Sequence, residues 1–163
     1  FNIFKGNKIN FGECFTESVA LISNVIIDSI LTNNSLNDLI KQELKFSILQ
    51  CSKILKFYNL DYENFLCNNC CFKSNKNWIE KTSVTAYFFC KLGIIWDYNT
   101  FIKEFMFKKN IDVNFLYNFI LNNLLSIDFL KEYKISDKLK KNLRMTINEF
   151  DWNILIKNSL NII

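Results

Sequence analysis

Apolar residues recur every three or four positions along much of this chain, which is the period of an amphipathic helix. From Thr16 to Leu31 the predicted apolar face consists of Val19, Ile22, Ile26 and Ile30. Thr32-Asn33-Asn34 interrupts this pattern, and Ser35 starts a second helix with Asp38 as its capping-box partner. The apolar positions of this long second helix are Leu36, Ile40, Leu44, Ile48, Cys51, Leu55 and Tyr58.

Residues 77–96, NWIEKTSVTAYFFCKLGIIW, are apolar on nearly every side of a helix. A helix of this kind belongs at the centre of a domain. Small residues recur along it at three- or four-residue spacing: Thr82, Ala86, Cys90 and Gly93. Such a stripe lets another helix approach closely. A stripe of small residues more often serves the packing of the chain's own helices. The alternative is that it forms the floor of a ligand site.

The remaining segments are predicted from polar breaks and shorter apolar runs. Helices are expected at 98–109, at 112–125 and as a pair within 127–160. The other segments are an irregular lead-in at 1–12, a corner at 59–61 with a short helix through Phe65, and a polar loop at 67–77. No linker divides the chain. The sequence therefore predicts one all-α domain over residues 1–163, a compact bundle of seven or eight helices around a central apolar helix.

Composition supports the helical class and argues against an enzyme. Half of the 163 residues are hydrophobic, 22% are charged, proline is absent and only three residues are glycine. Strand-rich folds and phosphate-binding loops rely on proline and glycine, so neither is expected. Histidine is absent and Arg144 is the only arginine, which removes the usual general base and the bidentate phosphate ligand. We expect no catalytic residue.

The net charge of +4 does not indicate nucleic-acid binding. Lysine is abundant together with phenylalanine, isoleucine, asparagine and tyrosine, all of which have A/T-rich codons, so codon bias accounts for much of the lysine excess. The basic cluster at 138–144 has Leu139 and Leu143 interleaved at helical spacing, which is typical of a solvated helix face.

The six cysteines do not form a recognisable metal site. Cys51 and Cys90 lie among apolar residues at helical spacing, where a reduced cysteine acts as a small core residue. Cys67-Asn-Asn-Cys70-Cys71 has the C-x-x-C spacing of a zinc knuckle, but no histidine or second C-x-x-C completes four ligands. We therefore predict free thiols in a reducing compartment, with no metal and no other cofactor.

The order of helices resembles the poxviral Bcl-like apoptosis regulator family. The resemblance rests on Leu36-Asn37, on QCSKILKFYNLDYENFL at 50–66 and on SVTAYFFCKLG at 83–93, which are similar to the second, third and central helices of that family. Asn77-Trp78 is similar to the Asn-Trp pair that opens the central helix in cellular relatives, although Ile79-Glu80 replaces the Gly-Arg that follows it there.

This resemblance implies an inhibitor of apoptosis that sequesters the amphipathic death helices of pro-apoptotic proteins in a surface groove, a helix-in-groove mode of binding. It implies a groove lined by Leu55, Tyr58, Phe65, Trp78, Thr85, Ala86 and Phe89. Lys81 is the cation nearest the start of the central helix and is expected to pair with the partner's aspartate.

The family resemblance also implies a location and an assembly. The expected location is the host cytoplasm, or the mitochondrial outer membrane if a C-terminal anchor follows Ile163, and a homodimer formed by helix exchange is an option. The most apolar stretch, Thr82–Trp96, is shorter than the roughly 20 residues that span a bilayer.

Two other classes of protein remain open. Glu80–Gly93 also resembles the inner helix of a HEAT-type repeat, so an α-solenoid scaffold for protein–protein interaction is the alternative function. A central helix wrapped by others would favour the Bcl-like fold, and a stack of helix pairs would favour the solenoid. Segments such as Trp96–Phe101 resemble the exit of an EF-hand loop, but the acidic ligands are missing, so calcium binding is not expected.

Overall fold

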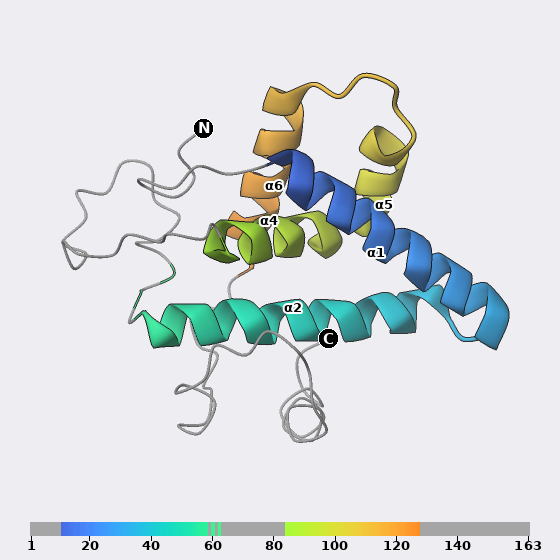
Figure 1. Ribbon diagram of the computed structural model, residues 1–163, viewed down its shortest axis with the longest axis horizontal. Coiled ribbons are helices and arrows are strands. Elements are labelled where there is room, and N and C mark those ends of the chain that lie inside the picture. Colours follow the sequence, from blue (N-terminus) through green and yellow to red (C-terminus); the bar gives the residue numbers. More distant parts are fainter. Residues whose placement is uncertain (1–10, 59, 61, 63–83, 128–163) are drawn as a thin grey trace.

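The computed structural model describes residues 11–58, 60, 62 and 84–127, and this part of the chain is entirely helical (Figure 1). It contains five α-helices and one π-helical segment, and no strand occurs within the described ranges. The predicted all-α class is therefore confirmed. Apart from Tyr62 and Ile127, the predicted helices at 61–65 and within 127–160 lie outside the described residues, as do the loop at 67–77 and residues 1–10 of the lead-in.

Helix α1 spans Phe11–Thr32 and begins five residues before the predicted start at Thr16. The prediction that residues 11 and 12 belong to an irregular lead-in is wrong. Tertiary packing extends the helix at this end, because the ring of Phe11 packs edge-on against Tyr117 with their centroids 6.1 Å apart. The Thr16 hydroxyl also donates a hydrogen bond to the Gly12 carbonyl at 2.9 Å.

The buried face of α1 consists of Cys14, Ser18, Ile22 and Val25. The predicted apolar position Ile22 is buried, but Ile30 is 75% exposed, so its assignment to the core face is wrong. The last turns of α1 extend beyond the helices that cover its first half (Figure 1). Among the described helices, α1, and not the stretch at 82–96, is long and apolar enough to cross a membrane, a test that core helices also pass.

Helix α2 spans Leu36–Phe57 and follows a turn in which Asn33 adopts a left-handed φ of 56°. Ser35 is the N-cap residue, as predicted, but its side chain makes no capping hydrogen bond. The expected capping box is therefore wrong. The Ser35 backbone carbonyl instead accepts hydrogen bonds from the amides of Asp38 and Leu39, each at 3.1 Å.

The predicted apolar face of α2 is confirmed, since Ile40, Leu44, Ile48, Cys51 and Leu55 are all buried. The second half of the helix is buried on every side, from Ser47 through Leu55. This run includes polar residues that the amphipathic pattern assigns to solvent, namely Ser47, Gln50, Ser52 and Lys53.

Helix α4 spans Val84–Trp96, inside the predicted helix at 77–96, whose first seven residues lie outside the described part. It packs against α1, α2, α6 and the short helix α5, which spans Tyr98–Phe101. Figure 1 shows α2 and α4 running antiparallel to each other. Every residue from Phe88 to Ile95 is buried, which agrees with the all-round apolar pattern of this segment.

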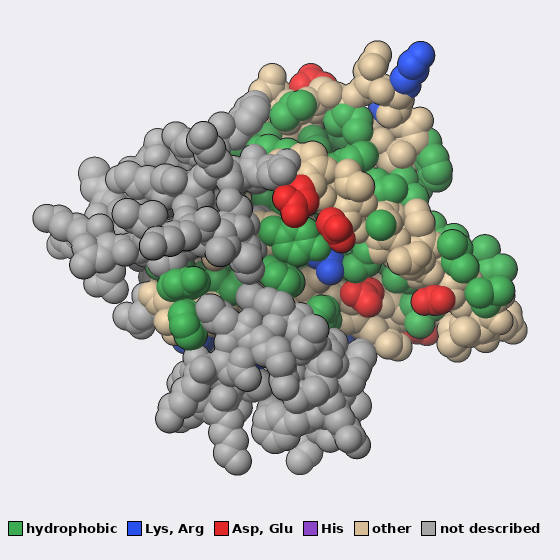
Figure 2. All heavy atoms as spheres, in the orientation of Figure 1, with side chains coloured by type: hydrophobic (Ala, Val, Ile, Leu, Met, Phe, Trp, Pro, Cys, Tyr) green, Lys and Arg blue, Asp and Glu red, His purple; other side chains and the backbone are tan. Residues whose placement is uncertain are grey.

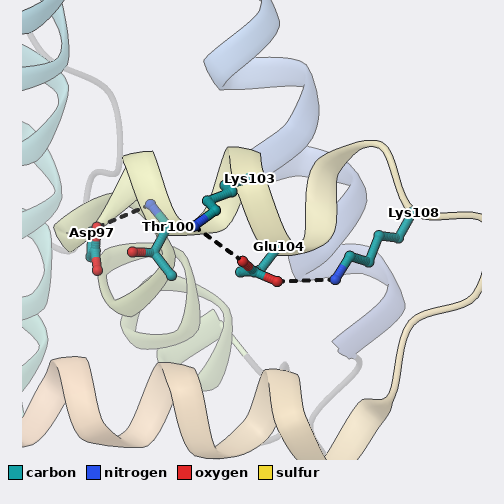
Figure 3. Close-up of polar contacts among 5 residues, drawn as sticks. All are labelled: Asp97, Thr100, Lys103, Glu104 and Lys108. Atoms are coloured by element: carbon teal, nitrogen blue, oxygen red, sulfur yellow. Dashed lines mark hydrogen bonds and ion pairs between the residues drawn. The ribbon is translucent and has the colours of Figure 1, made fainter.

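The segment predicted as one helix over 98–109 is divided. Asp97 caps α5 by accepting a hydrogen bond from the Thr100 amide at 3.1 Å (Figure 3). The π-helix η1 then spans Ile102–Met106, and regular structure ends there rather than at Lys109. The rings of Phe101 and Phe105 are both buried and stack 5.8 Å apart, so packing of aromatic residues accompanies the wider turn.

Helix α6 spans Val113–Leu125, which confirms the prediction for 112–125. Asp112 caps it, because its carboxylate accepts hydrogen bonds from the amides of Asn114 at 2.8 Å and Phe115 at 3.4 Å.

On the surface of η1, Glu104 contacts Lys108 at 3.0 Å and Lys103 at 3.8 Å (Figure 3).

Candidate functional site

The predicted groove residues are only partly within the described chain. Phe65, Trp78 and Lys81 lie outside it, as does the side chain of Ala86, whose backbone belongs to α4. Leu55 and Tyr58 lie at the C-terminal end of α2, while Thr85 and Phe89 lie in the first half of α4. The antiparallel arrangement brings these two ends side by side (Figure 1).

Three of these four residues form part of the protein interior. Leu55 is 4% exposed, Thr85 is 1% exposed and Phe89 is fully buried. Tyr58 is half-buried, packs against the core and has its ring edge-on to Phe57 at 5.1 Å. Among the four, Tyr58 is therefore the side chain most accessible to solvent.

Tyr62 is a buried tyrosine that the sequence pattern did not identify, and it packs against the N-terminal half of α4. The ring of Tyr62 stacks on Phe89 with centroids 6.2 Å apart and an interplanar angle of 25°. Its hydroxyl donates a hydrogen bond to the Leu124 carbonyl at 2.6 Å. Tyr62 thus connects the region after α2 to α4 and α6. The one sequence signal that could have identified Tyr62 is its position in the short helix predicted after the corner at 59–61.

The small-residue stripe on α4 allows close approach of a helix, as predicted. A methyl group added to Gly93 would lie 2.9 Å from both Cγ2 and the carbonyl oxygen of Ile120 on α6. The Asn123 side-chain amide donates a hydrogen bond to the Gly93 carbonyl at 2.8 Å. At this end of the stripe the approaching helix belongs to the chain itself, so the core-packing interpretation is confirmed at Gly93.

Several large apolar side chains are exposed in the described part of the chain. One group lies at the end of α1, where Ile27, Ile30 and Leu31 are 51%, 75% and 77% exposed. A second group flanks the connection from η1 to α6 and contains Phe107, Val113 and Phe115. Figure 2 shows apolar side chains gathered along the described surface in this view. Helical periodicity did not reveal these groups, because it assigns apolar residues to the core.

Three helices each contribute one buried cysteine to the same core cluster: Cys14 from α1, Cys51 from α2 and Cys90 from α4. All three are free thiols, as predicted for Cys51 and Cys90. The Cys14 sulfur lies 4.0 Å from the Tyr87 carbonyl oxygen. A hydrogen bond between the Cys14 and Cys90 thiols lowers the pKa of Cys14 and raises that of Cys90, and burial raises the pKa of Cys51.

Lys91 follows Cys90 on α4 and is only 8% exposed. Burial lowers the pKa of its ammonium group, because the interior solvates a charge poorly. The carboxylates of Glu43 on α2 and Glu17 on α1 act in the opposite direction. Figure 2 shows acidic side chains around a basic one on this face.

The described residues contain no candidate metal centre, and comparison of the chain with known proteins identifies no relative. Within 11–58 and 84–127, no three potential ligands among cysteine, aspartate and glutamate lie close enough to hold a metal ion. Comparison with protein families, curated proteins and solved structures finds no match for the chain.

Proposed function

We propose that this chain is a Bcl-like inhibitor of apoptosis that sequesters the amphipathic death helices of pro-apoptotic proteins in a surface groove. The supporting observation is that α4, the apolar helix, packs against α1, α2, α5 and α6. This arrangement and the order of helices agree with the resemblance described above. The proposal includes a bundle of seven or eight helices, of which the described residues contain five.

The packing of α1 supports a globular bundle over the α-solenoid alternative. In a solenoid each repeat contacts only its neighbours along the chain. Here α1 reaches distant segments, since Phe15 packs on Phe101 with centroids 5.5 Å apart and Cys14 contacts the Tyr87 carbonyl. A scaffold role receives correspondingly less support.

The proposed groove runs between the C-terminal end of α2 and the N-terminal half of α4. Tyr58 is assigned to direct contact with the partner helix, and Leu55, Thr85 and Phe89 to the interior that supports it. Phe65, Trp78 and Ala86 complete the apolar lining, and Lys81 pairs with the aspartate of the death helix. The proposed location is the host cytoplasm or the mitochondrial outer membrane, with homodimerisation as an option and no enzymatic activity.

Isothermal titration of the purified chain against a panel of pro-apoptotic death-helix peptides tests this proposal. We expect submicromolar binding to at least one peptide. Lys81→Glu should weaken it by about tenfold or more, because the partner's aspartate would then face a like charge. Lys103→Glu is the matched control, since this lysine on η1 has an 81% exposed side chain and lies outside the proposed groove.

Ala86→Phe provides a second variant that fills the proposed groove without changing charge. Thermal melts followed by circular dichroism establish that each variant is folded before titration. Loss of binding in both groove variants, with unchanged binding by Lys103→Glu, supports the proposal. Absence of binding to the whole panel at high micromolar concentration of folded protein would overturn it, and a scaffold role would then become the leading hypothesis.

A further inference from the structure

The connection from η1 to α6 carries three exposed apolar side chains, which we call the η1–α6 patch: Phe107, Val113 and Phe115. Phe107 is the most exposed large apolar residue in the described part of the chain, at 81%. The ring of Phe115 packs against the buried ring of Phe105 with centroids 5.0 Å apart, so the start of α6 lies beside η1. The patch therefore combines residues from two neighbouring elements. Figure 1 shows the connection along the edge of the described structure that is opposite α2.

Lysine side chains accompany the η1–α6 patch. Lys108 and Lys109 directly follow the exposed phenylalanine, and Lys103 lies on η1. The side chains of Lys103 and Lys108 are 81% and 51% exposed, and Lys109 is exposed as well. Glu104 lies between Lys103 and Lys108 and contacts both (Figure 3). Residues 103–109 therefore carry three positive charges and one negative charge, which leaves a net charge of +2.

The other exposed apolar group lies at the end of α1 and consists of Ile27, Ile30 and Leu31. Residues 27–38 there contain Asp28 and Asp38 but no lysine or arginine. The two exposed groups both offer apolar surface, and they differ in the sign of the charge around it. Positive charge next to exposed apolar side chains favours a partner that is both apolar and negatively charged, and an anionic lipid bilayer has both properties.

We propose that the η1–α6 patch docks on an anionic lipid bilayer. The ring of Phe107 enters the boundary between headgroups and acyl chains, while the neighbouring lysines contact lipid phosphates. The long apolar stems of lysine let the ammonium groups stay among the headgroups while the rest of the patch leaves water. Asp112, the acidic residue at the end of the connection, opposes docking little, because it caps α6 and the helix dipole offsets its charge.

A bilayer fits the patch better than a groove on another protein does. A helix that binds in a groove presents its apolar anchors at helical spacing on one face. Phe107, by contrast, follows the end of η1, and the other two apolar residues lie at the start of α6, so no single helix presents the patch. The proposal concerns a surface other than the proposed death-helix groove and does not depend on it, so either can fail without the other.

Co-sedimentation of the full chain with lipid vesicles tests the proposal. We expect the chain to bind vesicles of equimolar phosphatidylcholine and phosphatidylserine more tightly than vesicles of phosphatidylcholine alone. Added salt should weaken this binding, because it screens the attraction between lysine and phosphate. Phe107→Ser should weaken it by about tenfold or more, since the buried ring is lost. Lys108→Glu combined with Lys109→Glu should also weaken it by about tenfold or more, since each lysine near an anionic surface contributes a factor of about five.

Matched controls separate this surface from the rest of the chain. Lys108→Arg combined with Lys109→Arg preserves the charge and should retain binding. Ile30→Ser combined with Leu31→Ser removes apolar side chains from the end of α1 and should also retain it. All of these positions are exposed, so each variant should fold, and circular dichroism checks this before vesicles are added.

Phe107→Trp tests insertion directly. Brominated lipids quench a tryptophan that enters the acyl region, so this variant should be quenched more than the wild type, which has no tryptophan at this position. Absence of vesicle binding by the folded chain would overturn the proposal, and a protein partner would then be the leading hypothesis for this surface. Binding that either Phe107→Ser or the double glutamate substitution leaves unchanged would overturn it too, as would equal binding to vesicles of phosphatidylcholine alone.

Discussion

The hydroxyl of Tyr62 donates a hydrogen bond to the backbone carbonyl of Leu124 at 2.6 Å, which joins two buried residues 62 positions apart in the chain. The last four carbonyls of a helix have no partner within that helix. Leu124 lies in the final turn of α6, and its carbonyl also accepts a hydrogen bond from the Ile127 amide at 3.1 Å. Tyr62 therefore supplies a second partner at a buried helix end.

Replacing Tyr62 with phenylalanine should lower the free energy of unfolding by about 1 kcal/mol, because the stacked ring remains and the buried hydrogen bond is lost. Urea denaturation followed by circular dichroism measures this. Tyr98→Phe is the control, since the Tyr98 hydroxyl bonds to the Asn37 side chain in an exposed position and should matter far less. Equal losses in the two variants would contradict the assigned role of Tyr62.

Gly93→Ala should destabilise the protein by about 2 kcal/mol, although alanine favours helices by about 1 kcal/mol over glycine. The added methyl would lie 2.9 Å from the Ile120 carbonyl oxygen, and a backbone atom within α6 does not move easily. Gly12→Ala, at an exposed helical position in α1, is the control and should be neutral or stabilising. Thermal denaturation compares the two variants, and a stabilised Gly93→Ala would show that α4 and α6 are less closely packed.

Asp112→Ala should cost about 1 kcal/mol of stability, because the aspartate side chain caps two amides at the start of α6. The expected effect of Ser35→Ala is smaller, since the Ser35 side chain makes no capping hydrogen bond at the start of α2. Chemical denaturation of both variants measures the two losses of stability. A larger loss in Ser35→Ala than in Asp112→Ala would contradict this assignment and favour the capping box predicted at Ser35.

Lys91→Met should raise the free energy of unfolding at neutral pH by about 1 kcal/mol, because the buried ammonium group is replaced by an apolar side chain of similar length. The loss of attraction to Glu43 and Glu17 reduces this gain without reversing it. Lys103→Met, at an exposed position, is the control and should change stability little. A destabilised Lys91→Met would show that the two carboxylates outweigh the cost of burial.

The advantage of Lys91→Met should shrink as the pH rises toward 10.5. Burial lowers the folded-state pKa of Lys91 below its ordinary value of 10.5. At a pH between the folded-state and unfolded-state pKa of Lys91, the unfolded chain holds a proton that the folded chain lacks. Raising the pH in this range therefore stabilises the folded wild type. Measuring the stability of both proteins from neutral pH upward tests this sign. A difference that stays constant or grows would contradict it.

Helical periodicity predicted the described elements well where the spacing of apolar residues within one segment decides the outcome. It located α6 and the predicted apolar positions of α2 from Ile40 to Leu55. It failed where tertiary contacts decide the outcome. The start of α1 at Phe11 depends on a ring on α6, and the π-helical segment after Phe101 accompanies the packing of Phe101 with Phe105. Neither contact is encoded in local spacing.

The candidate site was predicted less completely than the fold. The family resemblance brought Leu55 and Phe89 into the groove hypothesis, but neither a resemblance nor the spacing of apolar residues distinguishes a groove lining from a core. The structure buries both and leaves Tyr58 partly accessible. Exposure depends on which helices cover a side chain, and that is a property of the assembled bundle.

The amino-acid sequence by itself determined that this protein is helical, because the apolar period, the absence of proline and the scarcity of glycine act within each segment. Only the tertiary structure decided which helices meet. It placed the Cys14 sulfur 4.0 Å from the Tyr87 carbonyl oxygen, buried Lys91 near Glu43 and Glu17, and packed α6 against Gly93. These contacts join residues far apart in the chain, so their energies exist only once the helices have packed around α4.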